Sequence, residues 1–499
     1  MKFLIWALCL LGWLSVGAQP LTPEKARADM KFLKRKLDRL YPGIGHYAPQ
    51  ANYERLYDSL VNQAAPPVSY HDFFQRQVVP LIASLKDGHL AVMHARDYII
   101  RPYRYFPFEV RQVGSRYYIS HNLSADTSLR RGTEILALNG EPFAAIHETL
   151  QRYHRGGNDG DLTAGARTRS LVYFPVYYLW WYGPQTYVTL TCRTPGDTTV
   201  RDATVSCLTS GQLHRYAVRR YRSEMKSTLP NLAVRKIDSL PGTAVLRIET
   251  FSNSSRDWFG LRYNRQLRKA FTEIKDQNVQ NLVIDVRNNG GGTVLNAVRL
   301  LSYWMPQPFQ LMEPGVIKRG GRSAYVKAWN PFTWMLFPVF YKKDPSGGFR
   351  ERPAPPKRKP QQELAYRGNL YFLVNGASYS ATTSVLAKTL DAGLGTFVGE
   401  PSGGAYWGDF AGQFQYVTLP NSGIRVRIPL KKLIHAVNPK NANGFTVEPD
   451  FTVDRTLDDI LQGRDYLLHR TLELVKQGKL AEREAKRRQS LSTELSSSR

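Results

Sequence analysis

The stretch YFLVNGASYSATTSVLAKTLDAGLGTFVG at residues 371–399 decides the architecture of the chain around it. Its first residues, 371–374, form a short aromatic and branched run that Asn375 and Gly376 end, a pattern typical of a buried strand. Residues 381–390 then predict a helix, with Ser380 in its N-cap position. A serine there is either a simple helix cap or a nucleophile in a field that favours developing negative charge. This stretch alone leaves both interpretations open.

The length of 499 residues exceeds one ordinary hydrophobic core and predicts about three domains. The chain begins with Lys2, an apolar run to about residue 14 and small residues at 16–18. This pattern predicts a secretory signal peptide at residues 1–18, cleaved after Ala18, with an uncleaved membrane anchor as the alternative. We therefore expect an exported protein, periplasmic or associated with the cell envelope.

Export and charge restrict the partners. Cys192 and Cys207 remain after cleavage and could form one disulfide, but the sequence does not show whether they pair. Their spacing suggests no metal site. The formal net charge of +27 predicts affinity for acidic surfaces such as an anionic membrane. A nucleic-acid partner is the competing interpretation, but no recognition motif accompanies the charge, and we expect none.

Patterns along the chain predict its order of domains. Apolar residues at helical spacing indicate a small helical domain at residues 20–100, which ends in the turn Asp87-Gly88 followed by His89. Residues 105–210 read as strands, and the run from Gly132 to Gly140 before a helix resembles a PDZ module, with a generic β domain as the alternative. An aromatic insertion at about 155–185 interrupts this domain and either packs a junction or lines a surface.

Residues 215–477 turn to an α/β pattern. The apolar strand at 282–286 leads into three glycines, 290–292, whose spacing fits no common nucleotide-binding motif. A basic, aromatic insertion at 307–362 predicts a hairpin or flap that touches acidic headgroups, covers a cleft or is merely a solvated loop. The charged, Ser-rich tail at 479–499 is predicted to be disordered.

In their order and spacing these segments resemble the C-terminal processing or tail-specific protease family, and more closely its tricorn-core-type branch. The likeness covers residues 20–477 and is carried by the PDZ-like module and by the segments 285–292, 374–381, 398–401 and 447–450. It implies a multidomain α+β fold in which a helical domain and a PDZ-like β domain precede a crotonase-like α/β catalytic core. It also implies a serine peptidase that needs no metal or organic cofactor.

The resemblance assigns roles to residues. It places the family's nucleophile on Ser380 and its oxyanion-binding amides on Gly291 or Gly292 and on Ala381. The lysine of the family's serine–lysine dyad is missing, because Ala405 occupies its position. The tricorn-type branch uses an N-terminal histidine as its base, and His89 matches that place.

A third catalytic group is expected to orient His89. Glu448 is the first candidate, while Asn443 and Glu400 stay open, and Thr383 stands where the family has an acid. The expected function is an exported serine endopeptidase that acts on proteins or peptides. The alternative is a catalytically inactive peptide-binding or envelope scaffold with the same fold.

Overall fold

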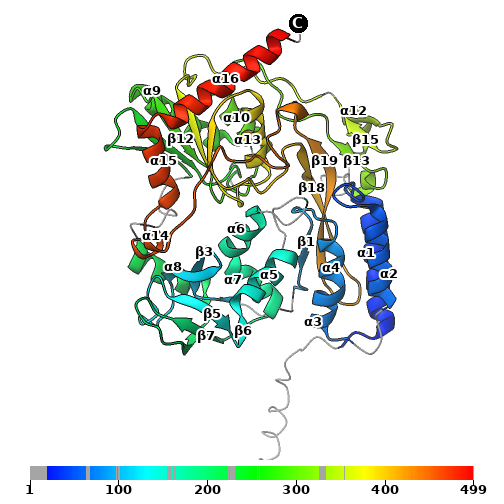
Figure 1. Cartoon of the computed structure of the whole chain (residues 1–499). Coiled ribbons are helices and arrows are strands. Elements are labelled where there is room, and N and C mark those ends of the chain that lie inside the picture. Colours follow the sequence, from blue (N-terminus) through cyan, green and yellow to red (C-terminus); the bar gives the residue numbers. More distant parts are fainter. Residues whose placement is uncertain are drawn as a thin grey trace, which may run out of the picture.

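The computed structural model describes residues 20–62, 68–96, 98, 102–153, 160, 164–222, 224, 231–255, 257, 259–324, 333–352 and 354–497 (Figure 1). The predicted signal peptide lies outside these residues. Within them, no helix is both long and apolar enough to cross a membrane.

A mostly parallel sheet forms the centre of the C-terminal half. Its strand order is β10 (Leu232–Lys236), β11 (Thr243–Ile248), β12 (Asn281–Asp285), β16 (Asn369–Val374), β17 (Thr396–Gly399) and β20 (Phe451–Thr452), with only β10 antiparallel. Successive residues of β12 enter opposite cores, because Leu282 and Ile284 pack in one cluster and Val283 in another. The predicted buried strands are therefore buried on both faces.

Helices cover both faces of this sheet (Figure 1). The larger core receives α9 (Leu261–Asp276), α10 (Val294–Leu301) and α13 (Ala381–Asp391). The opposite core receives α15 (Tyr466–Lys476) and the start of α16 (Lys479–Ser497), and α14 (Leu457–Leu461) precedes α15. The helix predicted at 381–390 is thus confirmed as α13, directly after the turn that follows β16.

The tail that was predicted to be disordered is the helix α16, so that prediction is wrong. Leu480 is fully buried in the core of the sheet, and the Glu484 carboxylate accepts hydrogen bonds from the backbone N–H groups of Leu370 (3.0 Å) and Gly395 (3.3 Å). Arg487 bonds the carboxylate of Asp450 and the carbonyl of Gly395. Glu484 and Arg487 are therefore paired with groups of the folded core, although the charged composition of this segment had suggested that it was solvated.

A second sheet joins the N-terminal helices to the C-terminal half. Its order is β1 (Ala91–Met93), β19 (Arg425–Ile434), β13 (Val316–Ile317), β15 (Phe349–Glu351) and β14 (Tyr341–Lys343), and β18 (Gly408–Thr418) also pairs with β19. The helical part comprises α1 (Pro23–Leu40), α2 (Gln50–Asn62), α3 (Tyr70–Phe73), the π-helical turn η1 (Phe74–Val78) and α4 (Val79–Ala83). Because β1 pairs with β19, the segment just before β1, which contains His89, is held against the C-terminal half.

The third sheet is antiparallel and lies below the centre in Figure 1. It contains β3 (Phe108–Val113), β4 (Arg116–Asn122), β5 (Glu134–Leu138), β6 (Glu141–Pro142), β7 (Tyr187–Arg193) and β8 (Arg201–Ser206). The helices near it are α5 (Phe143–Tyr153), α6 (Ala164–Val172), α7 (Phe174–Tyr182) and α8 (Ser210–Tyr221), and β2 (Arg104–Tyr105) pairs with β9 (Leu208–Thr209). The aromatic insertion therefore supplies α6 and α7, and the larger part of its rings is buried.

The third sheet also shows whether Cys192 and Cys207 form a disulfide. Cys192 pairs with Arg201 at one end of the β7–β8 hairpin, whereas Cys207 follows Ser206, which pairs with Tyr187 at the other end. Five positions along a strand separate the two ends by roughly 17 Å, and a disulfide needs Cα atoms within about 7 Å. Both thiols are free and buried, so the disulfide that export permits is not formed.

Candidate active site

Ser380 occupies a strained turn between β16 and α13. Its backbone has φ 59° and ψ −125°, a conformation that side-chain-bearing residues rarely adopt. The turn is fixed from both sides, because the Ser378 hydroxyl donates to the Val286 carbonyl (2.8 Å) and the Tyr379 N–H donates to the Asn289 carbonyl (3.0 Å). Although Ser380 is at the N-cap of α13, its hydroxyl makes no capping bond. The capping interpretation therefore does not account for this serine.

His89 reaches Ser380 from the other end of the chain. The Asp87 carboxylate accepts the His89 backbone N–H (2.7 Å), and Arg427 of β19 donates to the His89 carbonyl (3.0 Å). These contacts and the β1–β19 pairing place the imidazole Nε2 3.2 Å from the Ser380 Oγ. The two side chains are 291 positions apart in sequence and lie within hydrogen-bonding distance.

Tyr379, the residue before the serine, contacts the other nitrogen of the same ring. Its hydroxyl oxygen lies 2.6 Å from Nδ1 of His89, and the two rings are 4.7 Å apart. When Nδ1 carries the proton and donates it to the tyrosine oxygen, Nε2 is left as an acceptor for the serine hydroxyl. Nothing in the sequence pattern pointed to Tyr379, because a buried tyrosine in a turn is an ordinary core residue.

Two buried carboxylates lie near the imidazole. Asp87 is 3.9 Å from Nδ1, and Asp409 of β18 is 3.8 Å from Nε2. Both distances exceed a direct hydrogen bond, yet they place negative charge beside a ring that would become positive after accepting a proton. Sequence reasoning missed Asp409, whose position at the start of a long hairpin gives no catalytic signal.

The residues expected to orient His89 have other partners. The Glu448 carboxylate accepts the Thr446 hydroxyl (2.6 Å), and the Asn443 side chain bonds the backbone of Glu448 (2.9 and 3.1 Å). Glu400 accepts hydrogen bonds from the Thr168 hydroxyl (2.5 Å) and the Gly376 N–H (3.2 Å). Among the described contacts, none joins these three residues to His89. Tyr379 occupies the place that was expected for Glu448.

The helix α6 packs over this corner. A Cβ on Gly376 would lie 2.0 Å from the Gly165 Cα, so the helix and the turn meet backbone to backbone. The Arg169 guanidinium lies 5.3 Å from the centre of the Tyr379 ring. The aromatic insertion therefore serves as one wall of the site as well as filling a domain junction.

Burial and charge set the protonation of His89. Burial, followed by the nearby positive charges of Arg427 and Arg169, lowers the pKa of the imidazole from 6.5 to about 3. The ring is therefore neutral over the ordinary pH range. A neutral imidazole is the form that accepts a proton from a hydroxyl.

The glycine turn runs beside the serine. A Cβ on Gly291 would lie 2.8 Å from the Ser380 Cβ and 2.9 Å from the Ala381 nitrogen, so only glycine fits there. The Gly291 N–H already donates to the Asn289 side chain (3.0 Å). Within the described part of the chain, the N–H groups of Gly292 and Ala381 have no recorded acceptor. Of the three expected oxyanion donors, these two fit better than Gly291.

A second serine–histidine pair lies one helical turn further along α13. The Ser384 hydroxyl is 2.9 Å from the Nε2 of His435, and Nδ1 of His435 is 2.8 Å from the Tyr406 carbonyl. Ser384 is fully buried, whereas Ser380 is partly exposed. The described residues contain no cluster of three or more histidine, cysteine or acidic side chains suited to a metal ion.

A protein-family model and several solved structures resemble parts or most of this chain. Residues 242–453 match the model of peptidase family S41. Two solved structures of CPAF, one complexed with lactacystin and one of the mature protein, are each 18% identical, with TM-scores of 0.65 and 0.63; they cover 93% and 91% of this chain and 99% and 98% of their own. A photosystem II D1 C-terminal processing protease is 15% identical with a TM-score of 0.43, covering 89% and 98%. No curated protein matches the chain.

Proposed function

We propose that this serine peptidase, whose residues 242–453 belong to peptidase family S41, cleaves bonds within protein or peptide chains with Ser380 as nucleophile and His89 as general base. The observation that carries the proposal is the 3.2 Å separation of the His89 Nε2 and the Ser380 Oγ in a turn where the serine caps nothing. The shared fold with CPAF extends over nearly the whole chain and supports the same overall arrangement.

The chemistry follows the geometry. Nε2 of His89 takes the hydroxyl proton while Oγ attacks the scissile carbonyl, and the N–H groups of Ala381 and Gly292 bind the oxygen that becomes negative. The imidazolium then gives its proton to the leaving amine, and the acyl group stays on Ser380. Water hydrolyses the acyl-enzyme by the same route, with His89 again as base. Asp409 stabilises the imidazolium that forms in both stages.

We assign to Tyr379 the role of hydrogen-bond acceptor in the tautomer that this mechanism needs. Its oxygen accepts the Nδ1 proton of His89, so the lone pair of Nε2 faces the serine. In the serine–histidine–carboxylate arrangement a carboxylate does this work; a phenol does it without adding a negative charge. The nearest carboxylate to Nδ1, that of Asp87, lies 3.9 Å away, and burial together with Arg427 and Arg169 lowers the pKa of His89.

The proposal includes the setting of the enzyme. The predicted leader supports export to the periplasm or cell envelope, where proteins and peptides are the substrates and an acidic membrane surface is the nearby anionic partner. The antiparallel sheet with α5 and the central sheet with its helices are the regions that we assign to the PDZ-like and crotonase-like domains of the family.

A fluorophosphonate probe, which labels activated serines, tests the assignment. We expect the wild-type chain to be labelled and to cleave casein, and Ser380→Ala to lose both activities. Ser384→Ala is the matched control, because it removes a serine hydroxyl one helical turn away, inside α13, and should keep both activities. Peptide binding without turnover in the wild-type chain would favour the inactive scaffold instead.

A further inference from the structure

The most exposed apolar surface on a single described element belongs to α12 (Thr333–Phe340), in the basic insertion. Met335 is 69% exposed and Val339 56%, and Leu336 and Phe340 are about half exposed. Large apolar side chains are seldom left in water as a contiguous group without a partner. The helix lies at the upper right of Figure 1, at the edge of the molecule.

The opposite side of α12 is anchored, so this exposure belongs to a folded element. The Phe337 ring stacks on the Tyr341 ring at 4.7 Å and meets Phe349 edge-on at 5.1 Å. The Arg322 guanidinium lies 4.9 Å from the Phe337 ring, and Arg352 donates to the Pro338 carbonyl. The described contacts of α12 are made within the insertion rather than with the turn at Ser380.

Positive charge surrounds the apolar face. Lys342 and Lys343 follow the helix directly and are exposed, as is Arg352. Nearby acids are directed inward, because Asp344 pairs with Arg350 and Glu351 pairs with Lys431. The outer surface of the insertion is thus apolar and basic.

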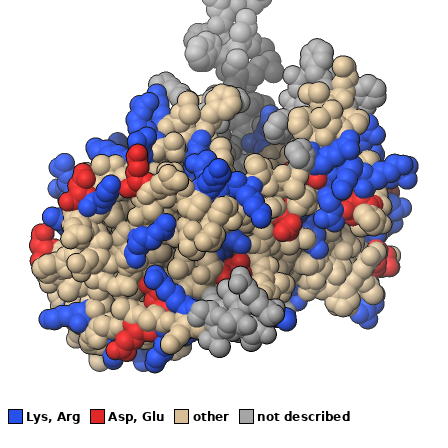
Figure 2. Space-filling model, turned by 90° about the horizontal axis from the view of Figure 1, so that it is seen from above, with Lys and Arg blue, Asp and Glu red and all other residues tan. Residues whose placement is uncertain are grey.

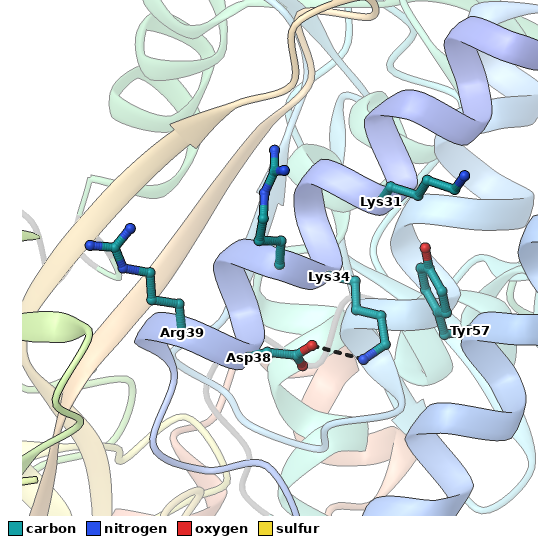
Figure 3. Close-up of a pocket in the computed structure, with 6 residues that line it drawn as sticks. Lys31, Lys34, Asp38, Arg39 and Tyr57 are labelled. Carbon is teal, nitrogen blue, oxygen red and sulfur yellow. Dashed lines mark hydrogen bonds and ion pairs between the residues drawn. The ribbon is translucent and has the colours of Figure 1, made fainter.

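The basic surface continues onto α1. Lys318 of the insertion donates to the Asp38 carbonyl (2.9 Å), and the Arg39 guanidinium donates to the Ser323 hydroxyl (3.2 Å), so the two elements touch. Figure 3 shows Lys31, Lys34, Asp38 and Arg39 lining a hollow on α1, to which Arg35 also contributes. Lys34 pairs with Asp38 (2.7 Å) and Glu54 (2.9 Å), whereas Lys31, Arg35 and Arg39 add positive charge. Figure 2 shows Lys and Arg predominating over Asp and Glu on the face seen there.

We propose that α12 and its basic surroundings form a docking surface for an anionic lipid membrane. The exposed side chains of α12 enter the boundary between headgroups and acyl chains, while Lys342 and Lys343 contact lipid phosphates. An apolar face beside basic residues is the arrangement that holds a helix in a membrane interface, and neither part suffices alone. An exposed apolar helix flanked by basic residues also fits a flat anionic surface better than an apolar groove in another protein. This proposal does not depend on the catalytic assignment.

Vesicle sedimentation tests the docking surface, with protein purified from the periplasm of an expression host. We expect the chain to bind phosphatidylglycerol–phosphatidylcholine vesicles and not pure phosphatidylcholine vesicles. Lys342→Gln with Lys343→Gln should lower the partition coefficient about tenfold or more. Met335→Ser with Val339→Ser should lower it by a similar factor and also remove the part of binding that survives high salt.

Matched controls separate this surface from general basicity. Arg235→Gln with Lys236→Gln removes two exposed charges elsewhere, and Tyr187→Ser with Val200→Ser removes two exposed apolar side chains elsewhere. Both control pairs should bind vesicles like the wild type, and all variants should keep the wild-type melting temperature. Equal losses in test and control pairs, or no vesicle binding by the wild type, would overturn the proposal. Concentration-dependent self-association that Met335→Ser with Val339→Ser abolishes would overturn it in favour of a second copy of the chain.

Discussion

The helix α13 carries two serine–histidine pairs one turn apart, and they are built for opposite purposes. Ser384 and His435 have the shorter separation, 2.9 Å against 3.2 Å for Ser380 and His89. The Tyr406 carbonyl also fixes the tautomer of His435, so that Nε2 accepts from the serine. By hydrogen-bond geometry alone, the inner pair looks like the better catalytic couple.

The two pairs differ in solvent exposure, in backbone conformation and in the groups that lie beside the serine. Ser384 sits inside the helix with ordinary backbone geometry and no exposure, so no substrate carbonyl reaches it. Ser380 precedes the helix in a strained conformation, beside the glycine turn and the backbone nitrogen of Ala381. A serine–histidine contact thus becomes a candidate catalytic site only when access and an oxyanion site accompany it.

The largest expected effect separates the two serines. Ser380→Ala should lower kcat/KM by about 10⁴-fold or more, because the nucleophile is lost. Ser384→Ala should stay within a few-fold of wild type. Casein or peptide hydrolysis with purified variants measures both, and equal losses would remove the distinction between the pairs.

Replacing His89 should affect activity, whereas replacing His435 should affect stability. His89→Ala should lower kcat by about 10³-fold or more while the melting temperature changes little. His435→Ala should instead destabilise the fold by about 2 kcal/mol, because it leaves Ser384 and the Tyr406 carbonyl without their buried partner. Urea unfolding together with activity per folded molecule distinguishes these outcomes. A stable but inactive His435→Ala would contradict the assignment.

A smaller loss is expected from Tyr379→Phe, about 10-fold to 100-fold in kcat with KM nearly unchanged. The ring and its packing remain, and only the oxygen that accepts from Nδ1 is removed. Tyr182→Phe is a suitable control, since it removes a tyrosine hydroxyl that donates to Glu141 (2.8 Å) in the aromatic insertion. If Tyr379→Phe instead raises KM and leaves kcat unchanged, Tyr379 contacts the substrate and does not orient the base.

The smallest effect on activity is expected from pH. Because the pKa of His89 is lowered to about 3, the base stays neutral as the pH falls, and kcat/KM should change little between about pH 7 and 5. A half-loss near the ordinary histidine pKa of 6.5 in a pH–rate profile would show that His89 is less buried, or differently paired, in solution.

Stability should respond to acid more than catalysis does. Burial lowers the pKa of His94, His147 and His435 to about 4. Below about pH 6.5 these histidines bind protons in the unfolded chain but not in the folded chain. The free energy of unfolding is therefore highest near neutral pH and decreases as the pH falls toward 4. The loss is about 1.4 kcal/mol per pH unit for each such histidine. Thermal unfolding across this range measures it, and a melting temperature independent of pH would contradict these burials.

Local patterns in the sequence were sufficient for part of the fold. The β16–turn–α13 unit and the apolar strand before the glycine turn follow from short-range periodicity and turn residues, which tertiary packing only reinforces. The helical nature of α16 did not follow, because Glu484 and Arg487 find their partners on distant strands. Composition cannot show where such partners lie.

The candidate site was predictable to a similar extent. The local patterns around Ser380 and His89 left their roles open, and the family resemblance assigned them, whereas nothing pointed to Tyr379 and Asp409. Their positions depend on which side chains the two sheets bring to one corner. Glu448 had the right chemistry for an orienting acid, but the local bond to Thr446 directs its carboxylate elsewhere. Register in a loop decides that direction, and sequence counting is least accurate there.

The packing of α16 against the central sheet affects how readily a protease could cleave this segment. A peptidase binds its substrate as an extended strand, yet here the segment after Lys479 is wound into a helix whose first turns are clamped by Glu484 and Arg487. A protease that acts on extended segments would therefore have to unwind the start of α16 and break its bonds to Leu370, Gly395 and Asp450.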